Sequence, residues 1–254
     1  MTRPADVVGV VLAAGAGTRL RPLTTLLPKA LCPVGGVALV DRAIERVRPH
    51  VTDLAVNAHH HAELLAAHVS QRAHLSVEMP QALGTAGALG HLRPWIAGRG
   101  ALVTNADAYL DGDLDPLLDR WDGRCVRLLV QRDPARGDFG DDRYAGSCLL
   151  PWSVVSRLEP VPTGLYEVVW RSLWLRGELE LVRHEGEFVD CGTPSDYLRA
   201  NLHASGGKSV VAPDAVVEGT LERCVVWPGA QVERGEHLVE SVRAPGMTVA
   251  APQG

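Results

Sequence analysis

The sequence has little lysine and no long apolar run. Only Lys29 and Lys208 are lysines among 254 residues, and the other basic side chains are arginine. No apolar stretch approaches the roughly 18 residues that a membrane-spanning helix needs. The first residues, Met1–Pro4, lead directly into an expected strand and do not resemble a signal peptide. We therefore expect a cytoplasmic protein that does not interact with membranes.

The cysteines show no pattern of a metal site or a disulfide framework. Their number is odd and no two of them have Cys-x-x-Cys spacing. They are Cys32, Cys125, Cys148, Cys191 and Cys224. Structural zinc and a disulfide scaffold are both disfavoured.

The net charge of -5 gives no overall attraction to nucleic acid or to an anionic membrane. Local clusters of basic residues can still bind phosphate groups, so any nucleotide binding should be local. The length allows one substantial α/β domain with a small appendage, or two modest domains.

A glycine loop follows the first expected strand. Residues 7–12 are continuous, apolar and β-branched, as in a buried strand. Gly15 and Gly17 come next, where the missing Cβ atoms let the backbone approach a bulky anion. Arg19 and Lys29 add two positive charges. This combination predicts a polyphosphate site.

Two common phosphate motifs are excluded at this loop. A P-loop ends in Gly-Lys-Ser/Thr, whereas Thr18-Arg19-Leu20 follows Gly17. A dinucleotide fingerprint needs a third glycine where Leu20 stands. A short Gly-x-Gly by itself is also common in ordinary turns between a strand and a helix.

The longer string is more specific. LAAGAGTRLRPLT at residues 12–24, with Pro28-Lys29 and residues 33–36, closely resembles the signature of sugar-nucleotide pyrophosphorylases. That resemblance implies that the backbone of the loop binds the nucleotide and that Arg19 and Lys29 contact the reacting phosphates. The implied nucleotide-binding residues of the loop are Leu12, Ala13, Ala14, Gly15, Gly17 and Thr18.

Apolar strands and amphipathic helices alternate after the loop. Val40, Ile44 and Val47 lie at helical spacing, residues 54–57 form an apolar run, and residues 63–69 again suit a helix. This alternation predicts an α/β fold with a doubly wound, mostly parallel sheet. The resemblance implies that the sheet is Rossmann-like, of the nucleotidyltransferase type, and we assign residues 1–204 to this catalytic domain.

His59, His60 and His61 are consecutive histidines that could suggest a metal site. Adjacent side chains on a helix point in different directions, and useful pairs lie three or four residues apart. We interpret them as a turn between a strand and a helix.

A second informative segment surrounds Leu83-Gly84-Thr85-Ala86-Gly87. In the family that it resembles, such a segment borders the base and ribose, which implies that Gly84 and Thr85 bind the nucleotide. Thr85 could also cap the following helix. The carboxamide of Gln81 could pair with a base edge, but its spacing to Gly84 is shorter than in uridylyl-transferring members. The sequence leaves the base open.

Two aspartates match the metal-binding positions of the family. Asp107 ends the expected strand at residues 101–107, where open α/β sheets place their ligands. Asp190 lies in FVDCGTP at residues 188–194, which resembles the aromatic-x-Asp-x-Gly-Thr-Pro signature with Phe188 in place of tryptophan. The resemblance implies that Asp107 and Asp190 bind Mg²⁺.

Residues 125–150 depart from the larger pyrophosphorylases. Those continue with a Glu-Lys-Pro motif, whereas this chain has no lysine between Lys29 and Lys208. The compact segment looks like the small uridylyltransferases that act on N-acetylmuramate 1-phosphate. Arg143 and Arg136 are candidates for the missing phosphate anchor, and the metal alone is the alternative. The resemblance implies that Glu167 accepts hydrogen bonds from sugar hydroxyls, although an acid at a helix start is an equally good interpretation. Gly146 is a further candidate for substrate binding.

The pattern changes after Gly206. Valines and leucines recur at intervals of six among glycines, which predicts a short, left-handed parallel β-helix over residues 205–254. A hexapeptide acyltransferase is a weaker interpretation than a module for homo-oligomerisation or for covering the catalytic domain.

Together these features predict an enzyme that transfers a nucleoside monophosphate from a nucleoside triphosphate to a sugar 1-phosphate, with Mg²⁺ as cofactor. Arg19, Lys29, Asp107 and Asp190 would be its catalytic residues. An enzyme that activates a non-sugar phosphate such as phosphocholine, and a catalytically silent regulatory homologue, are the alternatives. The sequence leaves the sugar and the sugar-phosphate anchor open.

Overall fold

The computed structural model describes residues 6–253, which divide into two compact units. Unit 1 comprises the described residues up to 15, together with residues 43–106 and 110–188. Unit 2 comprises residues 16–42, 107–109 and the described residues from 189 onward. Neither unit is one continuous segment, and the domain boundary expected at 204/205 stays a prediction. The expectation about Met1–Pro4 lies outside the described residues.

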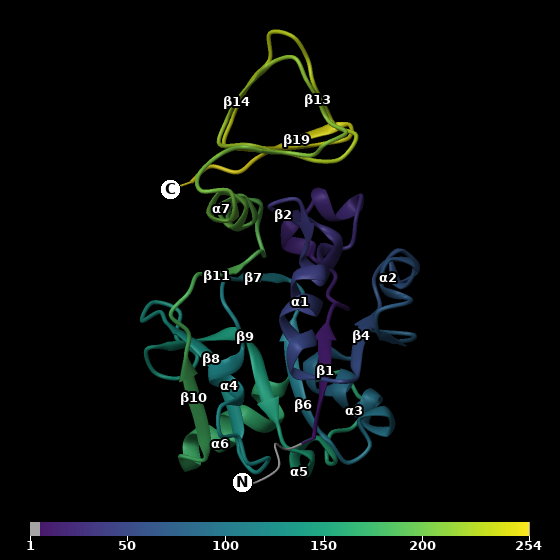
Figure 1. The fold of residues 1–254 in the computed structure, drawn as a ribbon, viewed down its shortest axis with the longest axis vertical. Coiled ribbons are helices and arrows are strands. Elements are labelled where there is room, and N and C mark those ends of the chain that lie inside the picture. Colours follow the sequence, from purple (N-terminus) through teal and green to yellow (C-terminus); the bar gives the residue numbers. More distant parts are fainter. Residues whose placement is uncertain (1–5, 254) are drawn as a thin grey trace. The chain divides into compact units, whose positions relative to one another are not determined.

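Unit 1 is built on a seven-stranded sheet (Figure 1). The order across the sheet is β10 (Leu179–Arg183), β8 (Val126–Arg132), β9 (Asp142–Leu150), β6 (Gly100–Asn105), β1 (Val7–Leu12), β4 (Leu54–Ala58) and β5 (His74–Val77). Strand β9 runs antiparallel to both of its neighbours, and the other pairings are parallel. The mostly parallel α/β sheet is therefore confirmed.

The central strand β1 shows why the sheet forms. It is an apolar, largely β-branched run in which Val8, Val10 and Val11 are fully buried. A strand that is buried on both faces has a continuous apolar sequence, because side chains on both of its faces lie in the core. Its carboxyl end meets that of β6, where Leu12 pairs with Asn105, and the Leu12 carbonyl accepts a hydrogen bond from Ala106.

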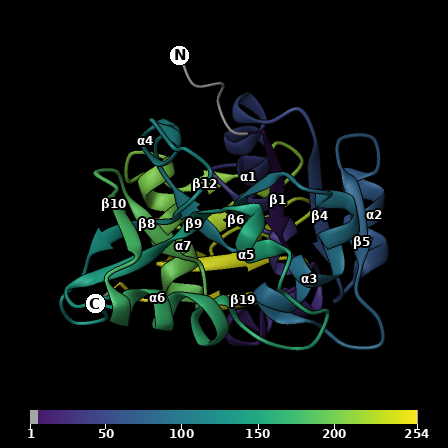
Figure 2. The same cartoon turned by 90° about the horizontal axis from the view of Figure 1, so that it is seen from below.

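Helices cover both faces of this sheet. Val8 and Val10 pack into one core cluster with residues of α3 (Gly84–Ile96) and of the π-helix η5 (Tyr166–Trp170). Gly9 faces the other side, where an added Cβ would lie 2.5 Å from Val47 Cγ1 of α1 (Leu39–Val47). Figure 2 shows α3, α5 and α6 on one side of the sheet and α4 on the other. Unit 1 is therefore doubly wound, as predicted.

The remaining helices of unit 1 are short and connect strands. They are η4 (Arg48–His50), α2 (Ala62–Val69), α4 (Asp115–Leu118), α5 (Trp152–Val155) and α6 (Arg171–Arg176). His59, His60 and His61 lie between β4 and α2, which confirms the predicted turn.

Unit 2 gathers short elements around its own core. Its first part has the 3₁₀ turns η1 (Thr18–Leu20), η2 (Leu23–Thr25) and η3 (Lys29–Leu31), and the hairpin of β2 (Pro33–Val34) and β3 (Val37–Ala38). Strand β7 (Ala108–Leu110) pairs with β11 (Phe188–Asp190), and α7 (Pro194–Ala204) follows. The core joins Leu20 and Leu23 of the turns to Tyr197 of α7 and to Trp227 of the tail. Tyr197 accepts a hydrogen bond from Trp227 Nε1 at 3.0 Å.

The tail repeats short strands at regular intervals. They are β12 (Val210–Val211), β13 (Val216–Val217), β14 (Thr220–Glu222), β15 (Val225–Val226), β16 (Gln231–Val232), β17 (His237–Val239), β18 (Ser241–Ala244) and β19 (Met247–Ala250). Pairings β12–β15, β13–β16, β14–β17 and β15–β18 are parallel, whereas β18–β19 is antiparallel. Figure 1 shows this part turning along a three-sided path, with β13, β14 and β19 on different sides.

None of the helices between residues 6 and 253 is both long enough and apolar enough to span a membrane. The expected cytoplasmic location stays a prediction.

Candidate functional site

Four of the predicted site residues meet in unit 2 as a cluster of alternating charge. Lys29 Nζ donates to Asp107 Oδ2 at 3.0 Å and to Asp190 Oδ1 at 3.4 Å. Arg19 Nη2 donates to the other oxygen of Asp190 at 3.3 Å. The Lys29 side chain is 6% exposed, whereas that of Arg19 is 65% exposed. Lys29 therefore forms the buried centre of the cluster, and Arg19 forms its solvent side.

Backbone pairing brings the two aspartates to the same place. Asp107 directly precedes β7 and Asp190 ends β11, and these two strands pair with each other. The amide of Cys191 donates to the carbonyl of Asp107 at 3.2 Å. Two segments that are remote in sequence thus present adjacent carboxylates.

Two glycines make room for the two cations. Gly17 has φ +59°, and an added Cβ would lie 2.8 Å from Thr24 Cγ2 and 3.0 Å from Lys29 Cβ. A Cβ on Gly192 would lie 2.8 Å from Arg19 Cζ. Thr24 also fixes the loop, because its hydroxyl donates to the carbonyl of Gly17 at 2.9 Å. Gly17 is therefore needed for the close packing of Thr24 and Lys29, whereas at Gly192 the exposed guanidinium of Arg19 could move aside.

Gly15, in unit 1, has a different environment. An added Cβ there would meet no atom within 4 Å. The protein itself does not require glycine at this position, so the open space fits a group that is not part of the chain.

A buried polar chain in unit 1 supports the start of the glycine loop. The amide of Ala13 donates to Asn57 Oδ1 at 2.6 Å, and Asn57 Nδ2 donates to Glu78 Oε1 at 2.6 Å. Glu78 Oε2 accepts from the amide of Leu83 at 2.7 Å. Asn57 and Glu78 are 3% and 1% exposed.

These hydrogen bonds connect two segments that are separate in the sequence, namely the glycine loop and the segment around Gly84. Asn57 and Glu78 belong to none of the motifs from which the site is predicted. The available signal was a polar residue at the end of β4 and another just after β5, both at the carboxyl edge of a parallel sheet.

The α3 N-terminus is held by the irregular segment before η5. Gly84 has φ +69°, and an added Cβ would lie 2.6 Å from the Thr163 carbonyl oxygen. Thr85 Oγ1 accepts a hydrogen bond from the amide of Leu165 at 2.8 Å. The suggestion that Thr85 caps α3 is wrong, because the cap residue is Leu83 and no side chain caps this helix.

The remaining predicted residues have mixed surroundings. Gln81 is exposed. Gly146 has φ +76° and lies in β9, next to the register shift between β8 and β9. Glu167 is exposed in the first turn of η5, where its carboxylate lies against Gly164.

The two candidate arginines for the sugar-phosphate anchor both contact Asp133. Arg136 Nε lies 2.9 Å from its carboxylate, and Arg143 Nη1 lies 3.9 Å from the same oxygen. Arg143 also lies over the ring of Phe188, 5.5 Å from its centroid. Both have structural partners, and their predicted role as anchor stays a prediction.

The thiols do not provide an activated nucleophile. Burial raises the pKa of Cys32, Cys148 and Cys191 to about 12 in each case. Burial also raises the pKa of Cys125 to about 11, helped by the neighbouring Glu180. A thiolate is the reactive form of cysteine, so these four side chains are poorly suited to covalent catalysis near neutral pH.

The donor set of Asp107 and Asp190 fits a hard divalent cation. Their carboxylates already converge on one positive centre, the ammonium of Lys29. Residues 6–253 contain no cluster of three or more His, Cys, Asp or Glu side chains that could hold a metal ion. Mg²⁺ is commonly bound by one or two carboxylates, with water and phosphate oxygens filling the other positions. The two aspartates meet that requirement.

Comparisons with known proteins find similar sequences along most of the chain. The family model described as nucleotidyl transferase matches residues 8–129. An N-acetylmuramate alpha-1-phosphate uridylyltransferase from Caulobacter vibrioides is 36% identical, over 77% of this chain and 96% of the relative. A mannose-1-phosphate guanylyltransferase from Mycobacterium tuberculosis is 24% identical, over 92% of this chain and 74% of the relative.

A solved structure shares the fold. It is provisionally described as a glucose-1-phosphate thymidylyltransferase from Bacillus anthracis, and it superposes with a TM-score of 0.68 at 22% identity. The match covers 78% of this chain and 95% of that one. The names of the relatives differ in both base and sugar.

Proposed function

Because this chain belongs to the sugar-1-phosphate nucleotidyltransferase family, we propose that it transfers a uridylyl group from UTP to an N-acetylmuramate 1-phosphate. The general reaction gives a nucleotide sugar and pyrophosphate. The proposal of these specific substrates rests on the 36% identity to the Caulobacter vibrioides uridylyltransferase, which extends over 96% of that relative. The compact segment at residues 125–150 also supports a small member of the family.

The chemistry needs charge and positioning and does not need a catalytic base. A phosphate oxygen of the sugar 1-phosphate attacks the α-phosphorus of the nucleoside triphosphate, and pyrophosphate leaves. The attacking oxygen is already anionic, so no proton has to be removed. The main difficulties are the approach of two anions and the negative charge of the transition state, which preorganised cations relieve.

The residues of the charge cluster supply those cations. Lys29 contacts the reacting phosphates from its buried position, and Arg19 neutralises the departing pyrophosphate from the solvent side. The amides that follow Leu12 bind the triphosphate, and Gly15 leaves space for it. Gly84 and Thr85 border the base, whereas Gly146 and Glu167 orient the sugar.

We further propose that Asp107 and Asp190 hold Mg²⁺. As a Lewis acid, Mg²⁺ would lower the charge of the triphosphate and polarise its α-phosphoryl group. Without a divalent ion, the two carboxylates balance Lys29 and Arg19, and the cluster has no net positive charge. The two aspartates therefore make nucleotide binding depend on the added cation.

Pyrophosphate release with a panel of substrates tests the proposed specificity. The panel crosses ATP, CTP, GTP, UTP and dTTP with sugar 1-phosphates and with phosphocholine. We expect the highest kcat/KM for UTP with N-acetylmuramate 1-phosphate. A higher value for another pair would show that the proposed substrates are wrong, and no turnover with any pair would favour a regulatory homologue.

We also propose that residues 205–254 form a short left-handed β-helix and that copies of the chain associate through it. The parallel stacking of β12 on β15 and of β15 on β18 supports the first part. Exposed Val211 and Val217 on the first strands support the second, because apolar side chains at a sheet edge favour association. Light scattering should give an oligomer that Val217→Asp dissociates, and a monomeric unmodified protein would contradict the proposal.

A further inference from the structure

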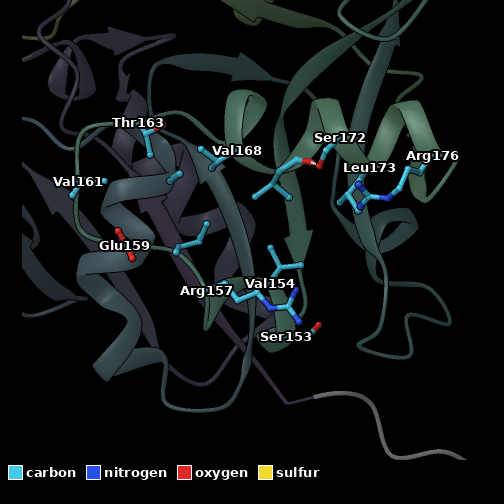
Figure 3. Close-up of a pocket in the computed structure, with 13 residues that line it drawn as sticks. Ser153, Val154, Arg157, Glu159, Val161, Thr163, Val168, Ser172, Leu173 and Arg176 are labelled. Carbon is cyan, nitrogen blue, oxygen red and sulfur yellow. Dashed lines mark hydrogen bonds between the residues drawn. The ribbon is translucent and has the colours of Figure 1, made fainter.

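Unit 1 contains a cavity that includes none of the residues assigned to the reaction. Its volume is about 370 Å³, and it lies between α3, α5, η5 and α6. We call it the α3–α6 pocket. Figure 3 shows its lining side chains, which come from the N-terminal part of α3 and from residues 153–176. This volume lies within the range of pockets that bind small molecules.

The walls combine apolar surface with positive charge. Val161 and Val168 are exposed valines that line the pocket, and Leu173 adds a partly buried apolar side chain. Arg157 and Arg176 also line it, and Figure 3 shows them on the side away from Glu159. The pocket therefore has an apolar wall and a cationic side.

The two arginines differ in their partners. Arg176 Nε is bound to Glu178 at 2.9 Å, which leaves this arginine partly compensated. Arg157 is exposed, and within residues 6–253 its guanidinium makes neither an ion pair nor a hydrogen bond to a side chain or carbonyl. A ligand with an anionic group on an apolar body would pair with this guanidinium and cover the neighbouring apolar side chains.

The pocket is directly connected to the segment that begins α3. Thr163 and Ala86 line it, and the Thr163 carbonyl accepts from the amide of Ala86 at 3.0 Å. The amide of Thr163 donates to the carbonyl of Leu83 at 2.9 Å. Gly84 is in close contact with the Thr163 backbone, so movement of Thr163 must be transmitted to Gly84.

We propose that the α3–α6 pocket binds a small organic anion with an apolar body and that this ligand strengthens nucleotide binding through Thr163. A ligand that orders residues 159–163 also orders Gly84 and Thr85, so less conformational entropy remains to be lost when the nucleotide binds. The coupling rests on the proposed function, in which Gly84 and Thr85 contact the base. The pocket itself does not depend on that function.

A fluorescent aromatic sulfonate, 8-anilinonaphthalene-1-sulfonate, tests the binding without any nucleotide. We expect saturable binding of one probe per chain and at least about tenfold weaker binding in Arg157→Ala, because a charge-assisted contact is lost. Arg176→Ala should weaken it less, since Arg176 already has a partner. Arg171→Ala is the matched control: Arg171 is exposed on the same helix α6 and does not line the pocket.

The neutral analogue N-phenyl-1-naphthylamine separates charge from apolar contact. Its affinity should be the same in the unmodified protein and in Arg157→Ala. Thermal unfolding of each variant verifies that the fold is kept. Equal sulfonate binding in Arg157→Ala and in Arg171→Ala would overturn the assignment of the pocket, as would the absence of saturable binding.

Calorimetric titration with UTP and Mg²⁺ tests the coupling. Saturating sulfonate should lower the Kd of UTP about fivefold or more, and UTP should lower the Kd of the sulfonate by the same factor, as linkage requires. In Arg157→Ala, the sulfonate concentration that half-saturates the unmodified protein should lower the Kd of UTP less, because a smaller fraction of the variant holds the probe. Competition between the sulfonate and UTP would place the probe in the nucleotide site and refute the proposal. Sulfonate binding without any nucleotide binding would retain the pocket but refute the proposed function and its coupling.

Discussion

The buried charge of Lys29 is compensated by two carboxylates whose own environments differ. The Asp107 side chain is 44% exposed, whereas that of Asp190 is 26% exposed and also contacts Arg19. An ion pair with solvent access on one side is screened, so its contribution to stability is modest. The proposed reaction therefore explains the cluster better than the stability of the fold does.

Asp107→Asn should therefore separate activity from stability. The amide keeps the size of the carboxylate but removes its charge, and the loss of one preorganised charge typically lowers turnover by about 10²- to 10³-fold. Pyrophosphate release measured over a range of Mg²⁺ concentrations should also reach half of its maximum at a higher concentration. Asp119→Asn, an exposed acid in unit 1, is the control. Turnover near that of the unmodified enzyme would remove Asp107 from the mechanism.

The two glycines of the loop make a matched pair of substitutions. Gly17→Ala should lower the melting temperature, because φ is +59° and the new Cβ would press on Thr24 and Lys29. Gly15→Ala should leave the melting temperature nearly unchanged, because nothing lies within 4 Å of its Cβ position. It should nevertheless weaken UTP binding, since the methyl group would enter the space that the proposed function assigns to the triphosphate. Unchanged UTP affinity in Gly15→Ala would contradict the position assigned to the triphosphate.

At the scale of elements, the carboxyl ends of β1, β4 and β5 are connected by side chains as well as by backbone pairing. Asn57 accepts a hydrogen bond from the amide of Ala13 and donates one to Glu78. Glu78 in turn accepts a hydrogen bond from the amide of Leu83. Fully satisfied buried networks specify one arrangement of the segments that they join. This network holds the start of the glycine loop and the segment before α3 in one geometry within unit 1.

Glu78→Gln should disturb that arrangement. Both carboxylate oxygens accept from donors, so the new amide nitrogen must face either Asn57 Nδ2 or the amide of Leu83. A buried donor left unsatisfied costs about 1–3 kcal/mol. Urea unfolding should show this loss, and UTP affinity should fall as well, whereas Glu63→Gln on the exposed surface of α2 should change neither. Equal stability of the two variants would show that the network contributes little.

The predicted elements agree well with the structure where one local pattern dominates. The strand at Val7–Leu12 and the helix at Leu39–Val47 follow from an apolar run and from helical spacing. Helix α7 begins at a Thr-Pro pair, and Thr193 caps it because its Oγ1 accepts a hydrogen bond from the amide of Asp196 at 3.1 Å. The cap suggested for Thr85 is wrong because Leu165, remote in the sequence, supplies the donor for that hydroxyl.

At the scale of the whole molecule, the tail is part of the core of unit 2. Trp227 is 2% exposed and donates to the hydroxyl of Tyr197. Leu20 and Leu23, which follow the glycine loop, belong to the same core cluster. The tail therefore supports the residues that carry Arg19 and Lys29.

Truncation after residue 204 should consequently impair the chain beyond any loss of oligomerisation. It removes Trp227 and uncovers Tyr197, so we expect poor solubility and no measurable pyrophosphate release. Trp227→Ala in the full chain should cost about 3–5 kcal/mol in urea unfolding, as large-to-small core substitutions do. A folded, fully active fragment of residues 1–204 would instead support the domain boundary predicted from the sequence.

The sequence by itself determined the family and the α/β class, and it selected Arg19, Lys29, Asp107 and Asp190 as candidate site residues, because these depend on local motifs and on strand and helix periodicity. Only the tertiary structure decided which other residues position and support the side chains of those motifs. Lys29 lies between Asp107 and Asp190 because β7 pairs with β11, and no local pattern encodes the pairing of such distant strands. The support from Asn57, Glu78 and Trp227 also comes from long-range packing, in which each partner is an ordinary residue until the fold brings the pair together.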